Sequence, residues 1–291
     1  MAIMTVLFAA LSFASPLIVR FLGRRSFYVL AAVPAAAFVH TIAATGTIAV
    51  PGGAVTESWA WIPQLEIVLS FRMDALAWLL ALVVTGVGAL VLAYCASYFD
   101  DDEPALGRFA GLLLGFAGTM YGLVTSDDVM VMFMYWEITS VLSYLLIGHY
   151  TGRKESRGAA LQALLVTTLG GLVMLVGVVM LSVGAGTTRI SELVADPQDG
   201  VLPAVAIVLV LVGAMSKSAI VPFHFWLPAA MAAPTPVSAY LHAAAMVKAG
   251  IYLVARFAPG YADSPAWIPV VVSVGVLTML VGAWRSLRQY D

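Results

Sequence analysis

The stretch VLVGAMSKSAIVPFHFWLP, residues 210–228, combines features that conflict within a single helix. It begins as an apolar run of the kind that crosses a membrane, but Lys217 stands inside that run. Pro222 and Pro228 follow shortly after, and a proline removes a backbone donor and clashes with the preceding turn. A buried ammonium group and an interrupted helix both cost free energy. The stretch therefore predicts a discontinuous membrane helix whose irregularity serves a function.

The composition of the whole chain is that of a membrane protein. Of the 291 residues, 62% are hydrophobic and 10% are charged, and the mean hydropathy is +0.98. A soluble domain carries about 25% charged residues, so too few polar side chains are present to cover a surface that faces water. The net charge of -2 gives no indication of a nucleic-acid partner. Cys95 is the only cysteine, which excludes an intrachain disulfide.

The chain contains nine stretches that can each span a bilayer, which takes about 20 apolar residues. They are residues 2–22, 27–49, 74–98, 108–125, 128–149, 158–186, 201–221, 235–257 and 266–285. No small-residue cleavage site follows the first, so we expect a retained span. The seventh is expected to end at Pro222 and to continue as a short piece from Phe223 to Met231. The predicted fold class is an all-α polytopic membrane protein with about nine transmembrane helices, the seventh discontinuous.

One segment has the pattern of a strand rather than a helix. In WIPQLEIVLSFR, residues 61–72, the apolar residues Leu65, Ile67, Leu69 and Phe71 recur at every second position. This period is typical of a strand and predicts a hairpin near residues 57–72 at the membrane surface. Trp59 and Trp61 are expected at the depth of the lipid headgroups.

Basic residues predict the orientation of the chain, because they are enriched on the cytoplasmic side. Nine fall on one side of the predicted spans: Arg20, Arg24, Arg25, Arg108, Arg153, Lys154, Arg157, Arg285 and Arg288. Three fall on the other side: Arg72, Arg189 and Arg256. We therefore expect a multi-pass protein of the bacterial cell membrane with its N-terminus outside and its C-terminus in the cytoplasm.

Four of the titratable residues inside the predicted spans are the candidate functional residues. They are Glu137, Lys217, His242 and Lys248. Ionisable groups at this depth are costly and usually functional, whereas Asp127 and Asp128 stand at a helix start and are expected to cap it. The sequence holds no pattern typical of a metal site, a nucleotide loop or a hydrolase. We therefore expect no metal and no cofactor, and a transporter subunit rather than an enzyme.

Small and polar neighbours favour a path for protons through these four residues. Ser140 and Tyr144 lie on the helix face of Glu137, and Ser216 and Ser218 flank Lys217. Burial disfavours the charged form of a lysine and a nearby carboxylate favours it, so a lysine under both influences can exchange its proton. The helix break is marked by Pro222, His224 and Pro228, and its free carbonyl groups can hold water or a cation. The alternative is that Glu137 and a lysine form a purely structural pair.

Three segments resemble the antiporter-like family, which comprises the proton-pumping membrane subunits of respiratory complex I and subunits of Mrp-type cation/proton antiporters. The segments are YWEITSVLSYLLIG (135–148), SKSAIVPFHFWLPAAMAAPTPVSAYLHAAAMVKAGIYLVAR (216–256) and FRMDALAWLL (71–80). PFHFWLP and HAAAMVKAG are most similar to the large A subunit of Mrp antiporters. The resemblance implies that Glu137, Lys217, His242 and Lys248 form a hydrated half-channel and a polar axis.

The resemblance also implies an architecture of about fourteen helices with two inverted five-helix repeats. Residues 1–106 correspond to an N-terminal three-helix segment, and residues 107–257 to the first repeat, helices 4–8. Residues 258–291 hold a ninth helix and the start of a second repeat that is otherwise missing, so we expect a truncated product or a fragment.

The implied function is a proton-conducting subunit of a multisubunit Na⁺/H⁺ antiporter, with other antiporter subunits, protons, a monovalent cation and the lipid bilayer as partners. Two alternatives stay open: a proton-pumping membrane subunit of an NADH-quinone oxidoreductase, which would be a translocase, and a nonconducting membrane scaffold.

Overall fold

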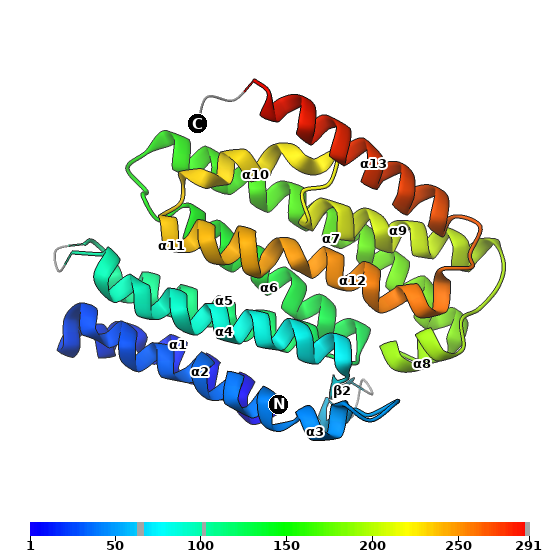
Figure 1. The fold of residues 1–291 in the computed structure, drawn as a ribbon, viewed down its shortest axis with the longest axis horizontal. Coiled ribbons are helices and arrows are strands. Elements are labelled where there is room, and N and C mark those ends of the chain that lie inside the picture. Colours follow the sequence, from blue (N-terminus) through cyan, green and yellow to red (C-terminus); the bar gives the residue numbers. More distant parts are fainter. Residues whose placement is uncertain (63–66, 101–102, 289–291) are drawn as a thin grey trace.

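Long helices lie side by side in a bundle, with a short β-hairpin at one end (Figure 1). The structure is a computed structural model and describes residues 1–62, 67–100 and 103–288. Within these ranges, seven stretches are long and apolar enough to cross a membrane. The first of them, Ala2–Ala43, contains two helices, and the shorter apolar helix α9 (Val201–Lys217) adds another. Each of the nine predicted spans therefore corresponds to a helix, and the predicted fold class is confirmed.

Most helix bounds lie within four residues of the predicted spans, but the second predicted span ends at Ala43 rather than at residue 49. The membrane helices are α1 (Ala2–Leu22), α2 (Ser26–Ala43), α4 (Ala75–Tyr98), α5 (Leu106–Thr125), α6 (Val129–Ile147), α7 (Lys154–Ala185), α9, α12 (Met246–Tyr261) and α13 (Trp267–Ser286). The 3-10 turn η1 (Gly23–Arg25) joins α1 to α2. Two short helices, α3 (Thr45–Ile48) and α8 (Ile190–Ala195), lie near the hairpin (Figure 1). At about 48 Å, α7 is longer than the ~30 Å hydrocarbon core, so it tilts or extends beyond it.

Two of the predicted spans are less regular than expected. The seventh ends at Lys217 rather than at residue 221, and is followed by η3 (Phe223–Phe225), α10 (Trp226–Ala229) and η4 (Ala230–Ala232). The eighth consists of α11 (Thr235–Val237), the π-helix η5 (Ser238–Ala244) and α12. Hydrophobic periodicity does not distinguish α from π geometry, so η5 was not predicted.

The predicted hairpin is present and anchors the start of α1. Strand β1 (Val55–Ile62) pairs antiparallel with β2 (Ile67–Met73), and Ser58 lies opposite Ser70. The amino group of Met1 donates to Glu57 Oε1 at 2.6 Å, and the amide of Ala2 donates to Glu57 Oε2 at 2.9 Å. Leu65, which belongs to the predicted alternation, lies outside the described residues.

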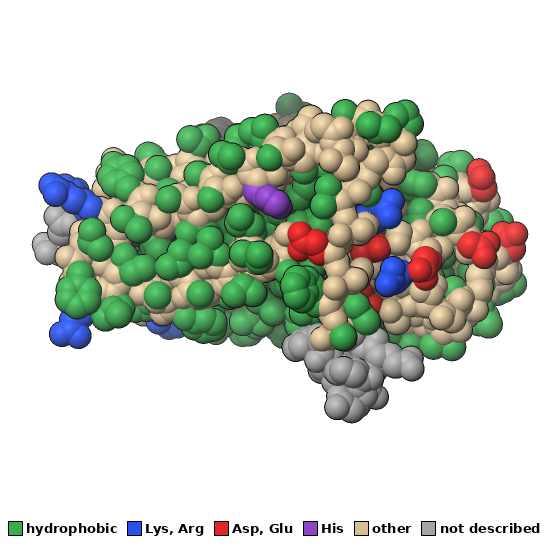
Figure 2. All heavy atoms as spheres, turned by 90° about the horizontal axis from the view of Figure 1, so that it is seen from below, with side chains coloured by type: hydrophobic (Ala, Val, Ile, Leu, Met, Phe, Trp, Pro, Cys, Tyr) green, Lys and Arg blue, Asp and Glu red, His purple; other side chains and the backbone are tan. Residues whose placement is uncertain are grey.

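Basic and acidic side chains are distributed unevenly between the two ends of the bundle. Basic side chains project from one end, and acidic side chains gather toward the half that carries the hairpin (Figure 2). The connections at the basic end include η1, with Arg24 and Arg25, and the start of α7 at Lys154. The ribbon shows these connections and the end of α13 at the same end of the bundle (Figure 1). The predicted grouping of basic residues therefore agrees with the fold.

Carboxylates near the hairpin fasten helices to one another. Asp128 caps α6 as predicted, because its Oδ1 accepts from the amides of Met130 and Val131 at 2.9 and 3.0 Å. Asp127 does not cap this helix; its carboxylate accepts from the amide and hydroxyl of Ser191, in α8, at 2.8 and 2.7 Å.

An ion pair also joins the start of α4 to α12 at this end of the bundle. The Asp74 carboxylate pairs with both terminal nitrogens of Arg256. Burial raises the pKa of Asp74, but the hydrogen bonds and charge of Arg256 outweigh that effect and hold the pKa below its usual value. The charged carboxylate therefore keeps the two helices together.

Candidate functional site

Lys217 is the most deeply buried charged group of the site. Its side chain is fully buried at the last position of α9, and Nζ donates to three groups of α6. The acceptors are the carbonyl of Trp136 at 2.6 Å, Thr139 Oγ1 at 2.6 Å and Ser140 Oγ at 3.0 Å. Nζ also lies 4.6 Å from the centre of the Trp136 ring, within the range of a cation–π interaction. Three neutral oxygens therefore satisfy all three donors of the ammonium group.

Helix α9 ends at this lysine because the chain turns left-handed two residues later. Ala219 has φ 52°, and the amide of Ile220 donates to the carbonyl of Met215 at 3.0 Å. The amide of Ala219 donates to the carbonyl of Ser216 at 3.4 Å. This pair of bonds is a Schellman motif, which usually takes glycine where Ala219 stands. The indole of Trp226 in α10 also donates to the Ser216 carbonyl, at 3.0 Å, and so ties the next helix to the break.

Glu137 lies on α6 beside the lysine pocket but faces a different helix. Its half-buried carboxylate interacts with Thr168 of α7, and a Cβ added at Gly171 would lie 2.1 Å from Glu137 Oε1. Oε1 is buried and has no hydrogen-bond partner in the described part of the chain. No salt bridge joins Glu137 to Lys217, both of which the structure describes. Glu137 therefore lies within one turn of the α6 residues that bind Lys217, but its carboxylate forms no ion pair with the lysine.

Adjacent glycines on α7 bring three helices close together at this site. Gly171 leaves the space that the Glu137 carboxylate occupies. A Cβ added at Gly170 would lie 1.8 Å from Ser216 Oγ and 2.4 Å from Ser216 Cβ, so α7 and α9 are nearly in backbone contact there. Small residues permit such close approach between membrane helices. The pair therefore fixes the positions of both Glu137 and the end of α9.

His242 and Lys248 occupy different environments although one predicted span contains both. His242 is buried in η5, and neither ring nitrogen has a hydrogen-bond partner among the described residues. Its ring lies 6.2 Å from that of Trp226, which connects it to the helix break. Lys248 is exposed on α12 and makes no hydrogen bond or ion pair within the described ranges. The isolated chain therefore brings His242 to the break but turns Lys248 outward.

Of the supporting polar residues named from the sequence, some form hydrogen bonds at the site and others form none. Ser140 binds Lys217, and Ser218 Oγ donates to the carbonyl of Val247 at 2.6 Å, which joins the break to α12. Ser216 donates to the carbonyl of Gly213 at 2.8 Å. Within the described part of the chain, the two ring nitrogens of the half-buried His224 have no hydrogen-bond partner. The Tyr144 hydroxyl makes no hydrogen bond to any described residue either.

The last two positions that the sequence named at the helix break are prolines. A cis peptide bond joins Val221 to Pro222. Pro222 and Pro228 are both exposed. They therefore border the break, while the left-handed turn at Ala219 ends the helix.

Comparison with known proteins assigns the chain to a family. A family profile described as NADH:quinone oxidoreductase/Mrp antiporter, TM, matches residues 126–291, more than half of the chain. The chain belongs to this family. A second profile, described as NADH-Ubiquinone oxidoreductase (complex I), chain 5 N-terminus, matches residues 59–110. The resemblance drawn from the three segments is therefore confirmed.

Individual members of the NADH:quinone oxidoreductase/Mrp antiporter family are much longer than this chain. The A-type subunit of the Na(+)/H(+) antiporter of Alkalihalophilus pseudofirmus is 42% identical over 87% of this chain and 31% of its own length. The probable A/B-type subunit of a K(+)/H(+) antiporter of Rhizobium meliloti is 42% identical over 82% of this chain and 24% of its own length. A chain in the structure of the Mrp complex from Dietzia sp. DQ12-45-1b matches with a TM-score of 0.88 and 38% identity, over 97% of this chain and 30% of that one. The chain thus spans about a quarter to a third of these relatives.

Several residues of the site were not predicted from the sequence. Trp136 and Thr139 bind Lys217, and Thr168, Gly170 and Gly171 position Glu137 and α9. Their types are common in membrane helices, so composition alone does not mark them. The adjacent glycines at 170 and 171 were the one available signal, because a pair of glycines inside a long apolar helix indicates close helix packing.

Proposed function

We propose that this chain is the part of a proton-conducting antiporter subunit that contains its first five-helix repeat, residues 107–257. Protons would pass through Glu137, Lys217, His242 and Lys248, and the complete complex would exchange them for a monovalent cation. The observation that carries the proposal is the fully buried Lys217 ammonium, held by three neutral oxygens at the end of a broken helix. The relatives described above are named as Na⁺/H⁺ and K⁺/H⁺ antiporter subunits, which supports a monovalent cation.

The hydrogen bonds of Lys217 suit a group that changes its charge. A hydroxyl group can both donate and accept, whereas an ammonium group only donates. Thr139 and Ser140 accept from the protonated lysine. After the proton leaves, either hydroxyl can turn to donate to the lone pair of the neutral amine. The pocket can therefore satisfy both forms of the side chain without moving a helix.

Glu137 is placed to favour the protonated form of Lys217 and to receive the proton that enters the path. Its carboxylate is close enough to favour the protonated lysine by charge, but no direct pair must be broken when a proton moves. The unpartnered Oε1 can take a proton, and the break beyond Lys217 leads to the unpartnered ring of His242. The proposed order is Glu137, Lys217, His242 and then Lys248.

The exposure of Lys248 fits a path that continues beyond this chain. In the proposed complex, the surface of α12 that carries Lys248 faces the rest of the subunit or a partner subunit. Most of α13 is also exposed and would be covered in the same way. The complex would lie in a bacterial cell membrane with the basic end of the bundle in the cytoplasm, because basic residues are enriched on that side.

A redox-driven proton pump is the second candidate function. The match of residues 59–110 to a complex I profile favours it specifically. In that case a different subunit would react with NADH and quinone, and this chain would supply a proton path of the same design. Genes for small antiporter subunits beside this one would favour the antiporter, and genes for quinone-reductase subunits would favour the pump.

The test of the proposed function is Glu137→Gln in the complete complex. Glutamine keeps the shape and hydrogen bonding of the side chain but cannot carry charge or take a proton. We expect proton/cation exchange in everted membrane vesicles to be lost while the amount of assembled subunit on an immunoblot stays near normal. Normal exchange at normal subunit levels would assign Glu137 a structural role and would favour a nonconducting scaffold.

A further inference from the structure

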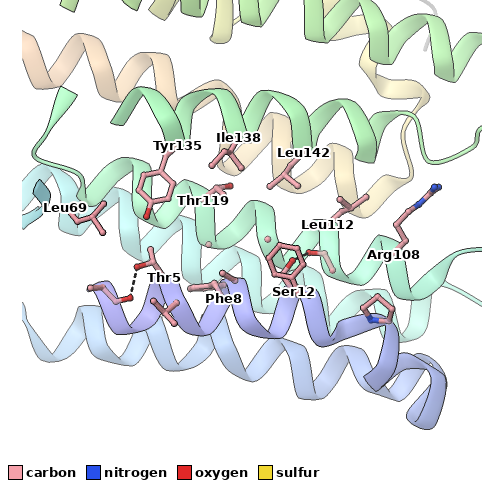
Figure 3. A pocket seen from close by; sticks show the side chains of 18 of the residues that line it. Thr5, Phe8, Ser12, Leu69, Arg108, Leu112, Thr119, Tyr135, Ile138 and Leu142 are labelled. Atoms are coloured by element: carbon pink, nitrogen blue, oxygen red, sulfur yellow. Dashed lines mark hydrogen bonds between the residues drawn. The ribbon is translucent and has the colours of Figure 1, made fainter. Parts of the chain in front are cut away.

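A groove of about 590 Å³ runs between α1 and α6, with α5 at its base (Figure 3). Its walls are apolar and include Phe8 of α1 and Ile138 and Leu142 of α6, which Figure 3 labels. Phe13 and Val6, also on its walls, are 87% and 67% exposed, so the groove opens to the outside of the bundle. This volume falls within the range of about 300–1,000 Å³ that is usual for small-molecule sites.

The hydroxyl groups in the groove already have hydrogen-bond partners. Thr5, Ser12 and Thr119 each donate to a backbone carbonyl, at 2.8, 2.6 and 3.0 Å. The side chain of Tyr135 interacts with that of Thr5. A molecule in the groove therefore needs no polar atoms along this length, and a hydrocarbon chain is the occupant that loses least by entering it.

Two arginines lie toward one end of the groove. Arg108 lines it at the start of α5 (Figure 3). On α1, the lining positions Ala9, Ser12 and Pro16 follow one helix face, and four residues further along that face stands Arg20, which is exposed in the last turn. Neither arginine enters an ion pair within the described ranges. The nearby carboxylate of Glu103 is engaged by His149, at 3.3 Å.

We propose that this groove binds one acyl chain of an anionic phospholipid, whose phosphate lies between Arg20 and Arg108. The groove follows α1 from Ala2 to Pro16, which corresponds to about 21 Å of helix. One leaflet of the hydrocarbon core is about 15 Å thick, so the groove can hold a chain across a whole leaflet. The charged end of the groove is also the end of the bundle where basic residues gather (Figure 2). That end would lie at the depth of the lipid headgroups in the membrane.

The test measures which lipid occupies the groove in the complete complex. A fluorophore is attached at Val141→Cys, an exposed position on α6 beside the lining residue Leu142 that does not itself line the groove; the native Cys95 is fully buried and stays unlabelled. The complex is placed in vesicles that contain phosphatidylcholine and phosphatidylglycerol, with bromine on the acyl chains of one lipid at a time. Bromine quenches the fluorophore on contact, so the two quenching curves give the relative affinity of the two lipids at the groove.

We expect phosphatidylglycerol to bind at least fivefold more strongly than phosphatidylcholine, since one arginine near an anionic surface contributes about a fivefold preference. Arg20→Ala with Arg108→Ala should abolish the preference. The matched control, Arg285→Ala with Arg288→Ala, removes two exposed arginines from the same end of the bundle at α13 and should leave it intact. Equal binding of the two lipids, or a preference that survives loss of Arg20 and Arg108, would overturn the proposal. So would absence of quenching by either lipid, which would mean that a protein segment fills the groove.

Discussion

Replacing Gly171 with alanine tests whether the position of the Glu137 carboxylate matters for transport. The added Cβ would lie 2.1 Å from Glu137 Oε1, 3.2 Å from the Trp136 indole nitrogen and 3.3 Å from Glu137 Cδ. Ordinary van der Waals contact begins at 3.4 Å. The carboxylate oxygen must therefore move by about 1.3 Å, the difference between 3.4 and 2.1 Å, to accommodate one methyl group.

The cost of this movement falls on function rather than on folding. The atom that must move is the far end of a flexible side chain, so the backbone of α6 need not shift. Alanine is also more favourable than glycine in a helix by about 0.8–1.0 kcal/mol, which offsets part of the strain. A displacement of about 1 Å at a reacting group can reduce a rate on the order of a hundredfold. We expect Gly171→Ala to lower exchange by ten- to a hundredfold in a normally assembled complex.

The assay is proton/cation exchange in everted vesicles with the subunit quantified by immunoblot. Gly158→Ala is the matched control, because Gly158 lies in the same helix and has no atom within 4 Å of an added Cβ. It gains the same helix propensity and should transport normally. Full exchange by Gly171→Ala at normal subunit levels would refute the argument that the Glu137 carboxylate must occupy its present place.

Two further predictions concern the ends of the bundle. Burial lowers the pKa of His149 from its usual 6.5, and the opposing effect of Glu103 is smaller. Unfolding then takes up protons, so the stability due to neutral His149 is complete above about pH 6.5 and is lost as the pH falls through the lowered pKa. The melting temperature of the purified complex should fall less between pH 7 and pH 5 in His149→Gln than in the wild type, and an equal fall would contradict this account. Single cysteines at Gly152 and Thr187, which lie at opposite ends of α7, should react with impermeant reagents from opposite sides of the membrane; reaction from the same side would contradict a spanning α7.

The sequence predicted the membrane helices and the hairpin well, because lipid imposes a simple rule on them. A stretch of about 20 apolar residues must form a helix to satisfy its own backbone, so the spans of α4 and α13 were predicted to within a residue. The alternation before Arg72 likewise predicted β2. These features depend on local pattern alone, and local pattern is what a single sequence contains.

The helix interruptions were predicted less accurately, because their positions depend on tertiary contacts. Pro222 was expected to end the seventh helix, but the left-handed Ala219 ends it at Lys217. Alanine has no intrinsic preference for that conformation, and the bond from Trp226 to the Ser216 carbonyl helps to hold it. The π-helix η5 is held in part by Tyr240, whose hydroxyl donates to the carbonyl of Val84 on α4 at 2.8 Å. Neither contact can be inferred without the fold.

The candidate site was named from its charged residues, and its contacts were not predicted. Glu137 and Lys217 were identified because ionisable groups stand out in apolar helices. A structural pair between Glu137 and a lysine was the alternative that the sequence left open, yet Lys217 binds Trp136, Thr139 and Ser140 instead. Which neutral groups surround a buried charge depends on the rotation of two helices about their axes, and sequence spacing fixes that rotation only to within a helix face.

The central claim is that Lys217 gains and loses a proton during transport, and Lys217→Arg tests it most directly. Arginine stays protonated at any working pH, so it can supply a charge but cannot act as a relay. The matched variant Lys217→Ala removes both functions, and both variants must assemble to normal levels on an immunoblot. The account predicts that proton/cation exchange by Lys217→Arg in everted vesicles is lost nearly as fully as in Lys217→Ala. Near-normal exchange by Lys217→Arg would contradict it, because Lys217 would then be only a fixed counter-ion for Glu137.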